Sequence, residues 1–434
     1  MTIVIGEPNG EVDTPAEGTN AIVRSALFTA VLLLTWIGLQ PFPDLSAATP
    51  ELERPTDIIY HAVALTLCGS CLIVAIPILR GALPSLVRPF AIMLILWLLI
   101  SVVTSQHVEL SSRRFFVAMT DITLALTVLL VPRGLEDFSR LLAVTAGCIL
   151  VVCYLGILLA PTLSIHQFTD ANEVDLAGNW RGLFGHKNTA GAAMAVFIII
   201  GLFVASTGRS VAGVTIAAAA AIFLLLTQSK NSIVLLPVTL VLALGVERAK
   251  SLCARFAIGL GPLVLLNLLT VGTVYLESLK RLVEHLPIDQ TFTGRTQIWA
   301  FVAEHIAERP FFGQGLRAFW YTNTVVDAEA AGNEWIAGVV NSHNGYLDLA
   351  LTIGLPGLAL MIVVFLVYPL LDYHRRQIEW TNEPLASLFL RLWLFEIYTS
   401  TFESFFFDRA FSGWFITLMA IFGLRYVAKL RIAP

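Results

Sequence analysis

The chain has 434 residues, of which 57% are hydrophobic and only 13% are charged, and its mean hydropathy is +0.78. A soluble domain of this size needs a more polar surface, so the composition excludes a soluble enzyme and predicts an integral membrane protein. The net charge of −4, without any long basic stretch, also predicts that there is no nucleic-acid partner.

The N-terminal residues 1–20 are polar and acidic, and they lack the basic stretch and the small-residue cleavage site of a signal peptide. The first apolar segment is therefore expected to stay attached to the chain. We interpret residues 1–20 as a cytoplasmic polar tail.

Apolar segments follow one another almost to the end of the chain, and a spanning helix needs roughly 20 such residues. We predict an all-α polytopic membrane protein, with residues 1–434 forming a single transmembrane domain of about twelve helices. The expected helices lie near 21–39, 58–79, 87–104, 115–131, 139–160, 189–206, 211–227, 232–246, 256–275, 344–370, 385–401 and 411–426. Glu396 and Glu403, near the end of this series, are interpreted as partners in ion pairs or hydrogen bonds within the bundle.

Lys and Arg residues in the short loops predict the orientation. With the N-terminus inside, the inner short loops hold about fifteen of them and the outer short loops about seven. Both termini are therefore expected to be cytoplasmic. Segments 161–188 and 276–342 then lie on the outer side, and they are too long to be simple connections, so functional residues are expected there.

A surface helix is predicted near 295–308 within the long outer loop, because apolar residues recur there at helical spacing. Thr293 is a suitable N-cap, and Pro310 ends the helix. We expect this helix to lie on the membrane surface. An ordinary docking helix is the alternative.

The first polar motif is NWRGLFGHKNTAG at 179–191, where Arg181, His186, Lys187 and Asn188 precede an apolar helix. The positive end of the helix dipole and the free backbone N–H groups favour an anion there, and an arginine can add a bidentate contact to phosphate. The alternative is that the basic residues are interfacial anchors.

Two further motifs carry single basic residues on the outer side. TQSKNS at 227–232 presents Lys230, which either contacts phosphate or ends a helix. TGRTQIW at 293–299 presents Arg295 at the start of the surface helix, where a cation opposes the dipole and needs a compensating partner. A bound anion would be such a partner.

The last motif is NSHNGYLDLALTIGLPG at 341–357, in which His343 and Asn344 precede a long apolar helix. Imidazole titrates near neutral pH, so His343 is a candidate for proton transfer. A lone histidine at a helix end is also commonly structural. The long outer loop and the basic residues predicted on the same face favour catalysis.

The segments RGLFGHKN, SKNS, GRTQIW and SHNGYLDLAL, in this order around a long outer loop, resemble the O-antigen ligase and polymerase (Wzy-like) superfamily over roughly residues 175–360. The chain length and ERPFFGQGL at 308–316 most resemble the exopolysaccharide polymerases of succinoglycan type (ExoQ-like). The resemblance implies a GT-C-like helical fold with a long periplasmic loop between helices 9 and 10.

By the same resemblance, the catalytic residues are expected to be Arg181, Arg295 and His343. The expected substrate-binding residues are His186, Lys187, Asn188, Lys230 and Asn344. Many relatives carry arginine where this chain has Lys230, and lysine lacks the planar fork that binds phosphate bidentately, which puts its role in doubt. Neither a metal nor another cofactor is implied.

The resemblance predicts polymerisation of undecaprenyl-pyrophosphate-linked oligosaccharides into exopolysaccharide, by metal-independent inverting transfer at the periplasmic face of the bacterial inner membrane. Expected partners are these lipid-linked sugars, membrane lipids, a chain-length regulator and the export machinery. One alternative is a ligase that moves the glycan onto lipid A core or a protein. Two others are a transporter of lipid-linked oligosaccharide or polysaccharide and a scaffold without catalysis, although a transporter would place more charge at mid-membrane.

Overall fold

The computed structural model describes residues 3–4, 21–38, 41–46, 55–170, 174–285, 292, 294–320, 322, 325, 339–376, 383–408 and 412–432. The long helices are α1 (Ala21–Ile37), α2 (Pro55–Leu86), α3 (Pro89–Val103), α4 (Val108–Val128), α5 (Leu135–Leu159), α7 (Lys187–Ser206), α8 (Ser210–Thr227), α9 (Lys230–Arg248), α10 (Leu252–Leu269), α13 (Arg295–Glu308), α15 (Gly345–Met361), α17 (Glu383–Thr399) and α18 (Ser412–Lys429). The short elements are α6 (Pro161–Ser164), η1 (Val174–Leu176), α11 (Gly272–Tyr275), α12 (Glu277–Glu284), the π-helical η3 (Ile362–Val367), α16 (Tyr368–Arg375), β1 (Ile3–Val4) and β2 (Arg431–Ile432).

The chain is a multi-pass helical membrane protein. Among the described residues, seven helical stretches are long and apolar enough to cross a membrane, namely Ile58–Leu86, Leu135–Leu159, Lys187–Ser206, Ser210–Thr227, Lys230–Arg248, Leu252–Leu269 and Gly345–Arg375. The helices α1 and α3 are shorter but apolar. All predicted spans fall on helices. However, α4 carries Glu109 and Arg113 near its start and α17 contains Arg391 and Glu396, and neither helix is among the seven stretches. The number twelve for the spans therefore stays a prediction.

The centre of the bundle is formed by α7 and α17. Helix α7 packs against α5, α8, α9 and α17. Helix α17 packs in addition against α9 and α18. Most side chains of α17 are buried. Because α7 begins and α17 ends at the same end of the bundle, their tight packing fixes the relative position of the polar segments at that end.

The contact between α7 and α8 depends on small residues, as is common where membrane helices approach closely. A Cβ atom on Gly213 would lie 2.3 Å from the backbone nitrogen of Ala205. We expect Gly213→Ala to lower the free energy of unfolding by about 1–3 kcal/mol through overpacking, measured by thermal unfolding in detergent. Gly69→Ala on α2 is the control, since nothing lies within 4 Å of its Cβ position. Equal stability of the two variants would contradict this account of the interface.

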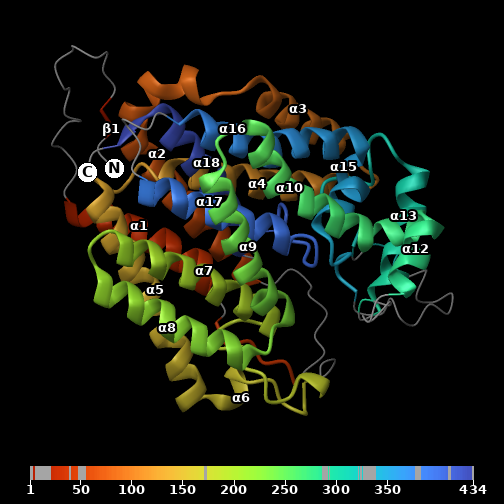
Figure 1. The fold of residues 1–434 in the computed structure, drawn as a ribbon, viewed down its shortest axis with the longest axis horizontal. Coiled ribbons are helices and arrows are strands. Elements are labelled where there is room, and N and C mark those ends of the chain that lie inside the picture. The colour runs from red at the N-terminus through yellow and green to blue at the C-terminus, as the bar shows by residue number, and fades with distance from the viewer. Residues whose placement is uncertain are drawn as a thin grey trace.

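One end of the bundle carries ion pairs among residues that the sequence assigns to inner loops or helix ends. Arg88, before α3, and Arg425 on α18 both bind the carboxylate of Asp372 on α16. Arg391 on α17 lies 3.3 Å from the carboxylate of Glu247 on α9. The strands β1 and β2 pair antiparallel, so the two ends of the chain lie side by side, while α12 and α13 lie at the other end of the long axis (Figure 1). The side of the membrane on which the termini lie stays a prediction.

Helix α15 is interrupted at Gly354, where φ is 71°, and the backbone carbonyls released by this break are bound by other segments. The Gln314 N–H donates to the Leu351 carbonyl at 2.8 Å, and Trp97 Nε1 donates to the Ile353 carbonyl at 2.8 Å. An irregular helix inside a membrane protein requires such partners. This break attaches the segment after α13 to α15, the helix that follows His343 and its N-cap Asn344.

The helix predicted near 295–308 corresponds to α13. Its buried side chains, including Trp299 and Val302, pack with Leu351 of α15 in a second apolar cluster. The apolar face of α13 therefore packs on the protein, and the position of this helix on the membrane surface stays a prediction. The predicted cap Thr293 lies outside the described residues.

Candidate active site

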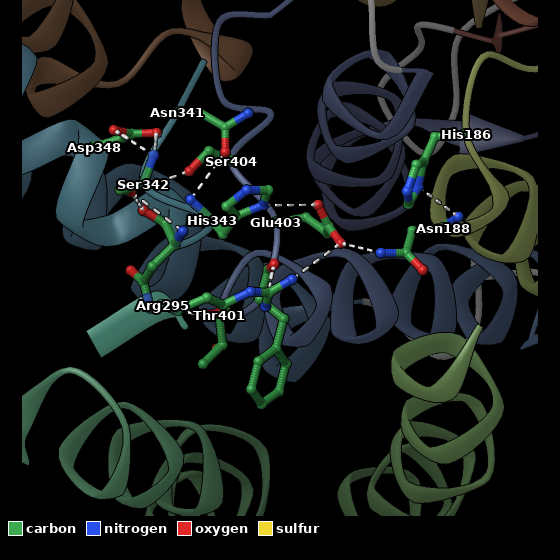
Figure 2. Close-up of polar contacts among 12 residues, drawn as sticks. His186, Asn188, Arg295, Asn341, Ser342, His343, Asp348, Thr401, Glu403 and Ser404 are labelled. Atoms are coloured by element: carbon green, nitrogen blue, oxygen red, sulfur yellow. Dashed lines mark hydrogen bonds and ion pairs between the residues drawn. The ribbon is translucent and has the colours of Figure 1, made fainter. Parts of the chain in front are cut away.

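Four segments that are distant in the sequence meet in one place. They are the start of α7, the start of α13, the loop before α15 and the segment that follows α17 (Figure 2). Each contributes one polar side chain to a cluster, which consists of Asn188, Arg295, His343 and Glu403. This set is called the Glu403 cluster below.

Glu403 is the residue that connects the other three. Its Oε1 atom accepts a hydrogen bond from Asn188 Nδ2 at 3.1 Å and lies 3.9 Å from Arg295 Nη2. Its Oε2 atom lies 3.8 Å from His343 Nδ1, which is within ion-pair distance but too long for a hydrogen bond. The sequence interpretation gave Glu403 only a general role in the bundle. Its position in the connection after α17, which the sequence predicts on the same outer side as His343, is the available signal.

The charge of Glu403 depends on its neighbours. Burial raises the pKa of this carboxyl. The adjacent His343 and the charge of Arg295 lower the pKa by more than burial raises it, so it lies below the ordinary value for glutamate. Glu403 is therefore a carboxylate at neutral pH. The cluster pairs one fixed negative charge with one arginine and one imidazole.

His343 is held by its backbone. Its φ angle is 52°, a region that residues other than glycine rarely adopt, and its N–H donates to Asn341 Oδ1 at 2.9 Å. The preceding Ser342 is fixed from two sides, because Trp299 Nε1 donates to its carbonyl at 3.0 Å and its N–H donates to Asp348 Oδ2 at 3.2 Å. The imidazole itself is 35% exposed. A fixed backbone thus presents an accessible imidazole, as a catalytic residue requires.

Arg295 is the first residue of α13 and has the compensating partners that its position requires. Its Nη1 atom donates to the Phe402 carbonyl at 2.9 Å, and the Glu403 carboxylate is its nearest charge. The side chain is only 15% exposed. Its guanidinium therefore lies at the cluster, on the side opposite Asn188.

The start of α7 is organised by neutral imidazoles. His186 Nδ1 accepts the N–H of Asn188 at 3.0 Å, and His166 Nε2 accepts the N–H of Lys187 at 3.2 Å. Burial lowers the pKa of His186 to about 4, so this residue caps the helix without adding positive charge at neutral pH. Lys187 Nζ lies 3.4 Å from the Gln228 carbonyl. Of the predicted anion-binding group, Asn188 is the member that bonds to Glu403.

Asn344 and Lys230 lie in different surroundings. Asn344 is fully buried and caps α15, with its Oδ1 accepting the Leu347 N–H at 2.9 Å and its Nδ2 donating to the Thr401 carbonyl at 2.9 Å. These bonds fix the loop of His343 to the segment that carries Glu403. Lys230 is an exposed residue at the first position of α9. Substrate contacts by either residue stay predictions.

Arg181 is fully buried and connects two loop segments. Its Nη1 donates to the Phe184 carbonyl at 3.2 Å, and its Nη2 donates to the Pro43 carbonyl at 2.9 Å. The structure thus brings Arg295 and His343 together around Glu403, whereas the hydrogen bonds of Arg181 run to the backbone of Phe184 and Pro43.

These bonds predict that Arg181→Ala destabilises the protein by roughly 2–3 kcal/mol, because one buried and one partly buried carbonyl lose a charged donor. Arg295→Ala removes a single carbonyl bond, the one to Phe402, so it should lower the melting temperature by less than Arg181→Ala does. Thermal unfolding of the two variants, measured in the same detergent, checks this difference. An Arg181→Ala protein of full stability but without activity would instead show that Arg181 acts on the substrate.

A comparison with protein families identifies a related segment. Residues 214–362 match the family model Wzy_C, described as O-Antigen ligase, over less than half of the chain. A search of curated proteins finds no match. The matched segment includes Arg295 and His343 but neither Asn188 nor Glu403. The part of the chain that carries this histidine and arginine is thus similar to the O-antigen ligase family, whose members carry out glycan transfer in membranes.

Proposed function

We propose that this protein is a membrane glycosyltransferase that polymerises undecaprenyl-pyrophosphate-linked repeat units into exopolysaccharide at the periplasmic face of the inner membrane. The observation that carries the proposal is the Glu403 cluster, which places an arginine, an imidazole and a carboxylate together beside a segment similar to the O-antigen ligase family. The choice of polymerase over ligase follows from the resemblance of ERPFFGQGL and of the chain length to the exopolysaccharide branch.

The donor in this proposal is a growing glycan on undecaprenyl pyrophosphate, and the acceptor is a sugar hydroxyl of a second lipid-linked unit. The hydroxyl oxygen forms a bond to the anomeric carbon, while the bond from that carbon to the pyrophosphate oxygen breaks. The electron pair leaves with undecaprenyl pyrophosphate, and the hydroxyl proton passes to His343. A single displacement of this kind inverts the anomeric configuration.

The leaving pyrophosphate gains negative charge, which Arg295 is positioned to stabilise. Its guanidinium is mostly desolvated, where a preorganised charge acts more strongly than in water. The sequence resemblance makes Arg181 an expected catalytic residue as well. Because the guanidinium of Arg181 bonds to backbone carbonyls, we propose that it supports the wall of the site and that Arg295 meets the leaving group.

The test is reconstitution of purified protein in liposomes with one undecaprenyl-pyrophosphate-linked repeat unit, followed by gel analysis of the products. A ladder of polymer that His343→Ala abolishes and His285→Ala retains supports polymerase activity. His285 is the matched control, because it is an exposed histidine outside the Glu403 cluster. Transfer that occurs only after a lipid A core acceptor is added would identify a ligase. Failure of transfer to both acceptors would contradict the proposed function.

A further inference from the structure

The carboxylate of Glu403 has two oxygen atoms with different surroundings. Oε1 accepts a hydrogen bond from the Asn188 amide, and the Arg295 guanidinium lies 3.9 Å away, so one donor and one positive charge hold its position. Oε2 is directed at the imidazole of His343. The first oxygen thus orients the carboxylate, and the second is left to act on the histidine.

The imidazole of His343 shows a complementary asymmetry. Its Nδ1 atom is buried and makes no hydrogen bond to any of the residues that the structure describes, although 35% of the side chain is exposed. The exposed part of the ring therefore lies away from Nδ1. A small approach of Glu403 would shorten the 3.8 Å separation to about 2.8 Å, the usual length of a charge-assisted N–H···O bond.

We propose that Glu403 is a positioning residue for His343. Its carboxylate keeps the proton of the imidazole on Nδ1, so that Nε2 is the atom that takes the proton from the acceptor hydroxyl. When Nε2 accepts this proton, the imidazolium is stabilised by Glu403, which itself remains a carboxylate. This inference rests on the proposed function, since it assigns the partner of the histidine that acts as base there.

A carboxylate is otherwise unfavourable close to a pyrophosphate, because both are negative. Asn188 and Arg295 hold this negative charge beside the imidazole. Among the described residues, further charged or titratable groups near the pair are His186 at the start of α7 and Asp348 of α15, which bonds to Ser342 next to the histidine. The alternative is that the carboxylate only occupies the place of a substrate phosphate and leaves when that phosphate binds.

The test compares Glu403→Gln with the unchanged protein by steady-state kinetics on the lipid-linked repeat unit. We expect kcat to fall on the order of 10²-fold, as for loss of effective base catalysis, with KM changed by less than about threefold. Glu277→Gln is the matched control, since Glu277 is an exposed glutamate on α12.

A double variant separates catalysis from structure. If Glu403 acts through His343, then Glu403→Gln added to His343→Asn should cause no further loss of kcat. A Glu403→Gln protein with unchanged kcat would overturn the inference. A lower KM together with a higher kcat would also overturn it, and would indicate that the carboxylate only occupies the place of a substrate phosphate. If the unchanged protein transfers no glycan at all, the proposed function fails instead, so the two failures are distinguishable.

Discussion

Loss of the His343 imidazole is expected to lower kcat by about 10²–10⁴-fold, because a positioned general base contributes an effect of this size. The most informative replacement is His343→Asn. Asparagine tolerates positive φ angles better than most residues, so it suits the φ of 52° at this position. The variant should therefore fold normally and bind the lipid-linked donor while losing transfer.

Two comparisons define this result. His343→Ala should show the same loss of kcat and a lower stability than His343→Asn, because asparagine adopts the left-handed region more readily than alanine. Thermal unfolding and transfer kinetics of both variants, with His285→Ala as control, measure the two effects separately. Transfer by His343→Asn at more than a tenth of the unchanged rate would exclude the histidine as the base.

Replacement of Arg295 by alanine is expected to reduce kcat by about 10²-fold or more, since it removes a preorganised charge from the leaving group. Arg295→Lys should recover only part of this loss. Lysine keeps the charge but lacks the planar fork that can bind a pyrophosphate and the Phe402 carbonyl together.

The measurement for Arg295 is the separate determination of kcat and KM with the lipid-linked donor. A loss seen mainly in kcat indicates an interaction made in the transition state. Arg281→Ala, which removes an exposed arginine of α12, should have no effect on either constant. If Arg295→Ala instead changed KM alone, Arg295 would bind the donor without accelerating transfer.

Much of the fold can be predicted from the sequence, because long apolar segments in a membrane protein form helices almost without exception. The predicted spans all correspond to helices, and the segment near 295–308 corresponds to α13. The break in α15 could not be predicted in this way. Gly354 can adopt a φ of 71°, but the break persists because Gln314 and Trp97, which are distant in the sequence, bind the released carbonyls.

In the candidate site, too, contacts between residues distant in the sequence could not be predicted. His343, Arg295 and Asn188 were singled out by local motifs, and the structure brings all three together around Glu403. Local motifs do not single out Glu403, because no such motif surrounds it and its partner Asn188 lies 215 residues away. For Arg181 the motif suggested a phosphate contact, whereas its bond to the Pro43 carbonyl, 138 residues away, has no sequence signal.

The most direct test of the proposed transfer is the stoichiometry between undecaprenyl pyrophosphate released and glycosidic bonds formed, measured in the same liposome reaction. The proposed reaction predicts one pyrophosphate carrier released for each bond, and loss of both products together in His343→Asn. Polymer growth without release of the carrier, or release that continues in His343→Asn at the unchanged rate, would contradict glycosyl transfer at the Glu403 cluster.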